Sequence, residues 1–189
     1  MQRALVTALV MMTLGCGSNS PTSPSGTGAT FNLMLRDSPF SDAKAVLVTF
    51  SQVTAHRASD ADFTTLPFAG GAPSRTCDLK KLQGAQEVLG TGTLPAAHYT
   101  MIRLVMSGAT IYFDNPSTGT ACAPSISAPS GQNAALDIPS GEVRLNRSFD
   151  VPASGTTTMV LDFNGDQSIR QMGNGRFSMT PVITVVSVQ

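Results

Sequence analysis

Residues 46–56 read VLVTFSQVTAH, and this stretch decides the fold. Apolar side chains occupy every second position from Val46 to Phe50, which is the period of a β-strand with one face buried in a core. The alternation continues at Val53 and Ala55, but on odd rather than even positions. A β-bulge at the two polar residues between the two sets would keep both of them on one face. The stretch therefore predicts one long strand that carries a bulge.

The same strand period recurs along the rest of the chain. A second interruption falls at Ser107-Gly108, where the alternating residues change phase between Met106 and Ile111, so a second bend or bulge is expected there. Helix signals are confined to residues 78–83 and 166–172. Many short strands separated by Gly and Pro turns predict an all-β fold, an antiparallel β-sandwich with one or two short helices. Further strands are expected around residues 31–35, 102–106, 143–149 and 159–163.

The last apolar run, residues 177–188, differs from the others because its apolar side chains fall on both parities. A strand that is covered on both faces has this pattern, so we expect an interior strand. Pro181 is expected at a bulge or at a locally unpaired position, since proline cannot donate to the ladder. The length from residue 30 to residue 189 suits one sandwich domain with a substantial core.

The start of the chain has the parts of an export signal. Arg3 supplies a positive charge, residues 4–14 are uncharged and largely apolar, and a glycine precedes Cys16. The motif Thr13-Leu-Gly-Cys16 resembles the lipobox of bacterial lipoproteins, in which the cysteine receives a diacylglycerol. Residues 1–16 are therefore predicted to be a lipoprotein signal peptide that ends at the lipidated cysteine. Ordinary signal-peptidase cleavage nearby is the alternative.

The segment after that cysteine is a predicted tether. Residues 17–29 read GSNSPTSPSGTGA, without a charge or a large apolar side chain. Such a segment cannot bury enough surface to order itself, so it is predicted to be a flexible Ser/Pro/Gly linker. A linker of this length has a root-mean-square reach of about 20 Å. It would hold the domain just off a membrane surface.

The two cysteines inside the domain form a candidate disulfide. With Cys16 assigned to the lipid, Cys77 and Cys122 remain as an even pair. An exported protein works where thiols can oxidise, so a bond between them is expected. Two unpaired thiols are the alternative, because spacing along the chain does not give the distance between their Cα atoms.

A succession of short motifs runs through the domain. The motifs are Asp37-Ser-Pro39, Val53-Thr-Ala-His56, Cys77-Asp-Leu79, Ile138-Pro-Ser-Gly141 and Leu161-Asp-Phe163. In this order they resemble the prokaryotic family numbered 4382 among the domains of unknown function. The resemblance implies a β-sandwich common in exported lipoproteins, similar to the transthyretin, immunoglobulin or carboxypeptidase-regulatory sandwiches. It implies no activity, because that family has no assigned function.

Sequence motifs for catalysis or cofactor binding do not occur. The two histidines, His56 and His98, form no His-Glu-x-x-His pair, so a zinc site would need ligands gathered from distant strands. The sequence contains no Gly-x-Ser-x-Gly elbow, phosphate loop or dinucleotide fingerprint. We therefore predict no catalytic residue, no cofactor and no metal.

One group of polar residues is a weak calcium candidate. Asp162, Asn164 and Asp166 place oxygen-bearing side chains at every second position, as calcium-binding loops do. The glycine falls at the wrong place for an EF-hand loop, which counts against a site. Asp166 is instead expected to cap the short helix that follows, and Asp37 and Asp42 are expected to be acceptors in a turn.

Charge and composition limit the class of partner. The chain has 12 basic and 12 acidic residues and no large basic cluster, which argues against nucleic acid. A protein is favoured over a glycan, because the chain has no Trp and only two Tyr to stack on sugar rings. We predict a non-catalytic binding or structural module of the bacterial cell envelope, periplasmic or surface-facing, held to the membrane through the lipid on Cys16.

Two other functions stay open. A hydrolase or metal-dependent enzyme built from dispersed residues would need His56 or His98 beside carboxylates in a pocket. A periplasmic carrier of a small apolar ligand would need a cavity between the sheets, lined by residues such as Met101, Met106 and Met159.

Overall fold

A computed structural model describes residues 27–38 and 41–189 of the chain. Within these residues, strands predominate over short helices. The elements are β1 (Gly28–Ser38), β2 (Ala45–Arg57), β3 (Phe63–Thr65), η1 (Ala69–Gly71), β4 (Arg75–Asp78), η2 (Leu79–Leu82), β5 (Glu87–Pro95), β6 (Ala97–Tyr112), β7 (Cys122–Ala123), β8 (Asn133–Asp137), β9 (Glu142–Leu145), β10 (Phe149–Val151), β11 (Thr156–Asn164), α1 (Gly165–Ser168), β12 (Ile169–Gln171), β13 (Phe177–Met179) and β14 (Ile183–Val188).

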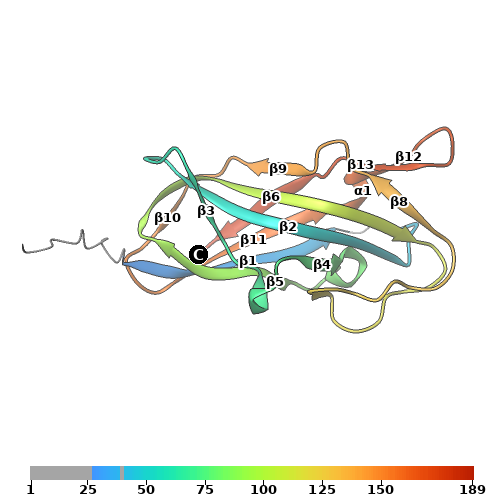
Figure 1. Ribbon diagram of the computed structural model, residues 1–189, viewed down its shortest axis with the longest axis horizontal. Helices are drawn as coiled ribbons and strands as arrows, with labels where there is room; N and C mark the ends of the chain where they lie inside the picture. The colour runs from blue at the N-terminus through green and yellow to red at the C-terminus, as the bar shows by residue number, and fades with distance from the viewer. Residues whose placement is uncertain (1–26, 39–40) are drawn as a thin grey trace, which may run out of the picture.

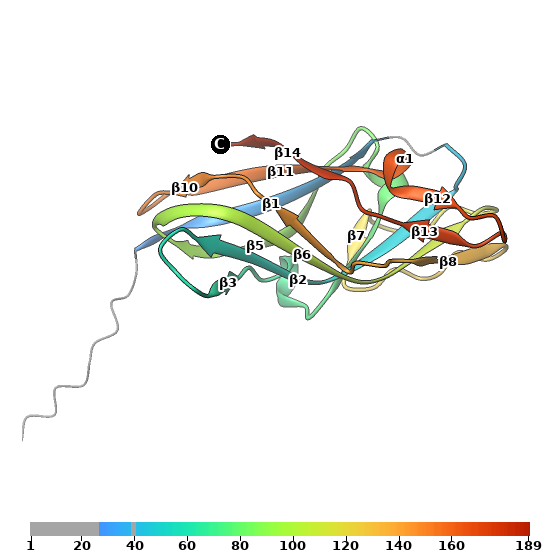
Figure 2. The same cartoon turned by 90° about the horizontal axis from the view of Figure 1, so that it is seen from above.

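Two β-sheets face each other, as Figures 1 and 2 show. Buried apolar side chains from both sheets form the hydrophobic core. One sheet has four strands in the order β14-β11-β1-β5. The other has ten strands, seven of them in the order β12-β13-β8-β6-β2-β4-β7, with β3 attached to β2 and with β9 and β10 attached to β6. The predicted all-β sandwich is therefore confirmed. No helix in the described part of the chain is long and apolar enough to cross a membrane.

Both predicted bulges lie in the ladder between the two longest strands, β2 and β6. The pairing register skips Ser51 on β2 and Ser107 on β6. Because of these skips, Phe50, Val53 and Ala55 all face the core, and none of the three is exposed to solvent. A bulge adds one residue to one strand of a pair, which returns the alternating side chains to the same face.

The sheets are mixed rather than purely antiparallel, and this corrects one detail of the prediction. β1 pairs with β11 in parallel and with β5 antiparallel, and β13 pairs with β8 in parallel. The parallel partners are far apart in sequence, as parallel pairing requires a long crossover connection.

β1 begins at Gly28, two residues before the predicted domain boundary at residue 30. A Cβ at Gly28 would collide with the backbone oxygen of Leu94 on β5, so this close approach requires glycine.

The prediction of one interior strand over residues 177–188 is wrong. The run divides into β13, in the ten-stranded sheet, and β14, at the edge of the four-stranded sheet. Pro181 lies in the connection between them, where no ladder hydrogen bond is needed. Apolar side chains occur on both parities within β14 because its pairing with β11 skips Val186. This bulge brings Val188 onto the same face as Ile183 and Val185. Val186 on β14 is 45% exposed, as suits an edge position.

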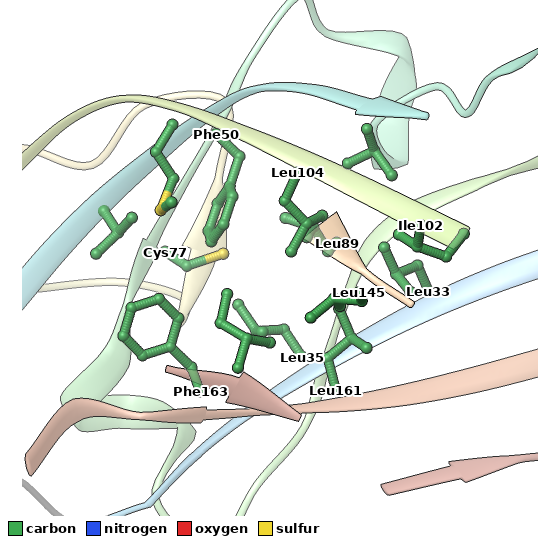
Figure 3. Packing of buried hydrophobic residues seen from close by; sticks show 14 of the residues in the cluster. Leu33, Leu35, Phe50, Cys77, Leu89, Ile102, Leu104, Leu145, Leu161 and Phe163 are labelled. Atoms are coloured by element: carbon green, nitrogen blue, oxygen red, sulfur yellow. The ribbon is translucent and has the colours of Figure 1, made fainter. Parts of the chain in front are cut away.

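The predicted disulfide between Cys77 and Cys122 is confirmed. Both cysteines are buried, and they lie opposite each other on the paired strands β4 and β7. Figure 3 shows Cys77 within the core, among apolar side chains that include Phe50 and Phe163. The bond therefore ties the short strand β7 to the main sheet from inside the hydrophobic core.

The methionines that the carrier hypothesis named occupy ordinary core positions. Met106 and Met159 are buried members of the hydrophobic cluster, and Met101 is half-buried. Flexible thioether side chains commonly fill such packed interiors. These three residues therefore give no support to a ligand cavity between the sheets.

Two of the three described helices, η2 and α1, are close to the predicted places, and η1 was not predicted. The 3₁₀-helix η2 falls inside the predicted segment 78–83, with the Asp78 side chain accepting the backbone N–H of Lys80 at 3.1 Å. The helix α1 ends at Ser168, earlier than predicted, because residues 169–171 extend as β12 and pair with β13. Asn164 caps α1, with its side-chain oxygen accepting the N–H of Gln167 at 2.9 Å. The prediction that Asp166 is the cap is therefore wrong.

Candidate functional site

The sandwich has two chemically different ends. β1 and β11 run in parallel, so Ser38 and Asn164 reach the same end of the molecule while Gly28 lies at the other. We call the end at Ser38 the distal end and the end at Gly28 the proximal end. The 11 residues of β1 separate them by roughly 33 Å at the usual rise of an extended strand. Figure 2 shows β8, β12 and β13 gathered at the distal end, away from the start of β1.

The distal end carries a groove of about 700 Å³. Its volume is in the usual range for sites that bind small molecules or segments of other chains. We call it the distal groove, and it is defined by Asp42, Phe113, Gln132, Asp166, Ile169, Gln171, Gly175 and Phe177.

Three apolar side chains supply the hydrophobic part of the groove. Phe113 follows β6, and Phe177 lies on β13, and their rings are in contact with centroids 5.4 Å apart at an interplanar angle of 42°. Ile169 is buried at the start of β12. The backbone N–H of Phe113 donates to the carbonyl of Gln132 at 3.0 Å, which fixes the end of β6 beside the start of β8.

Polar side chains surround these apolar groups. Asp42, Asp166, Gln132 and Gln171 line the groove and are all exposed. The turn that connects β12 to β13 has Gly175 at a φ of 75°, a backbone conformation that glycine adopts without strain. An apolar floor with a polar rim is typical of binding surfaces. The two carboxylates make the rim acidic.

A second, more polar cleft lies at the same end. It has a volume of about 470 Å³ and is lined mainly by the end of β1, residues 84–86 and Asp162 of β11. Arg36 Nε donates to one carboxylate oxygen of Asp162 at 2.9 Å, and Ser38 Oγ donates to the other at 2.8 Å. Both oxygens of Asp162 are therefore occupied by the protein's own donors.

Asp37 is the most unusual ionisable group at this end. It is 6% exposed, and its Oδ1 accepts the backbone N–H of Gly165 at 3.2 Å. Burial, with a further contribution from the nearby charge of Asp162, raises the pKa of Asp37 to about 7. Its Oδ2 is buried and accepts no hydrogen bond from another residue that the structure describes. Asp37 thus connects β1 to α1, and the prediction that it is a simple turn acceptor missed its burial.

The structure does not bring the three calcium candidates together. Asp162 is held by Arg36 and Ser38, Asn164 caps α1, and Asp166 lines the distal groove. Within the described ranges, no group of three or more His, Cys, Asp or Glu side chains could hold a metal ion.

The two histidines lie outside both clefts. His56 contacts Thr100 Oγ1 through Nδ1 at 3.3 Å, and its ring packs against Phe63 at 4.9 Å between centroids. His98 Nδ1 lies 2.7 Å from the carboxylate of Asp150, but the two side chains are 49% and 82% exposed. Neither histidine lines the distal groove or the polar cleft. The geometry required for the hydrolase hypothesis is therefore absent at both described clefts.

Sequence reasoning missed most of the distal groove. Phe113, Ile169 and Phe177 follow the ordinary alternation of strand residues, and nothing in their spacing marks them as neighbours. They meet only because β13 pairs with β8 and β8 pairs with β6.

The predicted lipidation site, Cys16, lies outside the described residues.

Comparison with known protein families identifies a match over most of the chain. A family model described as "Domain of unknown function (DUF4382)" matches residues 28–181. The match begins at the first residue of β1 and ends at the proline between β13 and β14. No curated protein and no solved structure matches the chain.

Proposed function

We propose that this chain, which belongs to the family described as a domain of unknown function (DUF4382), is a lipid-anchored module of the bacterial cell envelope that binds a partner and catalyses nothing. Its binding surface is the distal groove. Its anchor is a lipid on Cys16, at the start of the predicted tether.

The observation that carries the proposal is the position of the groove. The groove lies at the distal end, and the domain begins at the proximal end with Gly28. A tether that leads into Gly28 would turn the proximal end toward the membrane. The groove would then face away from the membrane, where a partner can reach it.

The disulfide supports export of the domain. Disulfides persist in oxidising compartments such as the bacterial periplasm and are rare in the reducing cytosol. The bond between Cys77 and Cys122 lies in the core rather than on the surface. The same compartment is the destination that the signal sequence predicts.

The chemistry of the groove supports binding rather than catalysis. The lining residues that the structure describes supply carboxylates, carboxamides and apolar groups, and none of them is His, Cys, Ser or Lys. A Ser or Cys nucleophile paired with a His base is the usual feature of acyl-transfer hydrolases, and these residue types do not supply one. Apolar side chains surrounded by hydrogen-bonding groups serve recognition instead.

The anchor can be tested by metabolic labelling with an alkyne-tagged fatty acid. The wild-type protein should take up the label and fractionate with the membranes. The Cys16→Ser variant should lose the label and become soluble, because its thiol can no longer receive a lipid. Unlabelled wild-type protein, or a labelled Cys16→Ser variant, would contradict the proposed anchor.

The groove can be tested by filling it. We would capture the full-length protein from its own envelope after reversible crosslinking, using the wild type, a Gln132→Trp/Gln171→Trp variant and a Ser154→Trp control. Ser154 is exposed in the turn at the proximal end. A partner that accompanies the wild type and the control, and is lost from the filled variant, is the expected result. A partner retained equally by all three proteins would overturn the proposal.

A further inference from the structure

The residues that line the distal groove favour one chemical class of binding partner. This inference rests on the function proposed above. We infer that the groove binds a cationic, extended segment of another protein. One apolar side chain of that segment would pack on Phe113, Ile169 and Phe177. A neighbouring Lys or Arg would reach the acidic rim formed by Asp42 and Asp166.

The charge of the rim favours a cation. Among the described residues, Asp42 and Asp166 are the ionisable ones that line the groove, and no Lys or Arg lines it with them. Asp42 accepts a hydrogen bond from Ser41 Oγ at 2.9 Å, and neither carboxylate forms an ion pair with another described residue. Arg176 lies on the adjoining turn but does not line the groove. Two unneutralised carboxylates repel an acidic partner and attract a basic one.

The carboxamides suit an extended backbone. Gln132 and Gln171 each carry a side-chain donor and a side-chain acceptor, and both are exposed at the groove. The N–H and C=O groups of an extended segment can pair with them while its side chains alternate between the groove and solvent. Such a segment presents apolar and cationic side chains close enough together to contact floor and rim at once.

The aromatic groups fit a peptide better than a sugar. Sugar faces usually stack on Trp or Tyr, whose rings carry a polar atom, and neither residue type lines the groove. Phe113 and Phe177 are half-buried, and their rings are tilted against each other. An aliphatic side chain can fill the concave surface that they form with Ile169.

The inference is tested with a synthetic peptide of alternating Leu and Lys, labelled with a fluorophore and titrated into full-length protein in detergent. A Leu/Glu peptide and a neutral oligosaccharide are the comparison probes. We expect binding of the Leu/Lys peptide alone, weakened by added salt. The Asp42→Asn/Asp166→Asn variant should bind it about tenfold more weakly, which is the effect expected from losing two exposed charge pairs.

A matched control separates local charge from net charge. The Asp62→Asn/Asp150→Asn variant removes the same charge from the proximal end and should bind the Leu/Lys peptide like the wild type. Equal weakening in both variants, or tighter binding of the Leu/Glu peptide or the oligosaccharide, would overturn the cationic assignment. If the Gln132→Trp/Gln171→Trp variant still loses its envelope partner in that case, the binding function stands and only the class of partner is wrong.

Discussion

The rings of Phe113 and Phe177 contact each other at 5.4 Å between centroids, and this contact joins the end of β6 to β13. The two residues also line the distal groove. The same pair therefore stabilises the distal end and forms part of its proposed binding surface. A substitution at either residue should lower both the stability of the domain and binding at the distal groove, but to different degrees.

Replacing Phe177 with Ala should lower the free energy of unfolding by about 1–2 kcal/mol, because the side chain is only half-buried. Binding at the groove should fall much more, because part of the apolar floor is lost. Chemical denaturation and titration with the Leu/Lys peptide measure the two effects. Val186→Ala is the control, since Val186 is 45% exposed on the edge strand β14 and does not line the groove. Equal effects of the two variants on binding would contradict the claim that Phe177 forms part of the apolar floor of the binding groove.

Removing the disulfide should destabilise the domain strongly. The bond joins residues 45 positions apart, and opening a loop of that length costs about 4 kcal/mol in the chain-entropy model. We expect that loss for the Cys77→Ala/Cys122→Ala variant, measured by urea denaturation under oxidising conditions. The wild type should approach the stability of the variant when a reductant is added. A wild type that is insensitive to the reductant would show that the bond contributes little.

Asp78 should be a second stabilising connection, next to the disulfide. This fully buried carboxylate accepts the N–H groups of Val46 and Lys80 on Oδ1 and the hydroxyl of Ser117 on Oδ2, the last at 2.5 Å. Asp78→Ala should cost about 3 kcal/mol, because it leaves a buried N–H without an acceptor. Asp78→Asn keeps one acceptor oxygen and should cost less. Equal losses for the two variants in denaturation would contradict a hydrogen-bonding role.

Stability should depend on pH through Asp37. The pKa of this carboxyl is about 7 in the folded protein against an ordinary value of 3.8, so the folded state holds the proton more tightly. Ionisation therefore costs stability as the pH rises from about 4, and the full loss is reached above about 7. Asp37→Asn keeps an acceptor for the N–H of Gly165 and removes the charge.

The free energy of unfolding of the Asp37→Asn variant, relative to the wild type, should therefore rise between pH 4 and pH 8. Urea denaturation at a series of pH values measures this difference. Asp137→Asn is the control, because Asp137 is exposed on β8 and should give the same pH dependence as the wild type. A pH-independent difference between Asp37→Asn and the wild type would show that the Asp37 charge is not the cause.

Local sequence patterns were sufficient to predict the sandwich and both bulges, whereas the disulfide was expected from the even pair of cysteines and the predicted export. The alternation over residues 46–56 specified which side chains face the core, and its change of phase was explained most simply by a β-bulge. Pairing between distant strands was not predictable in this way. The parallel pairing of β1 with β11 and the division of residues 177–188 between two sheets depend on long-range contacts that leave no periodic signal.

The candidate site was less predictable than the fold for the same reason. Asp37 and Asp166 look like ordinary turn and cap residues in sequence, yet one is buried against α1 and the other lines a groove. Burial of a carboxyl is decided by the elements that pack around it, here β1, α1 and the segment after η2. The preference for a protein partner over a glycan, which rests on the absence of Trp and the scarcity of Tyr, stays a prediction.

The most direct measurement of the central claim is photo-crosslinking in intact cells. A benzophenone amino acid would be placed at Gln171 in the distal groove or at Ser154 in the proximal turn, one position at a time, in the full-length protein. We predict a discrete crosslinked species from Gln171, its loss when Phe177→Ala is added, and no such species from Ser154. A discrete species from Ser154 with none from Gln171 would contradict the claim that the distal groove is the binding surface.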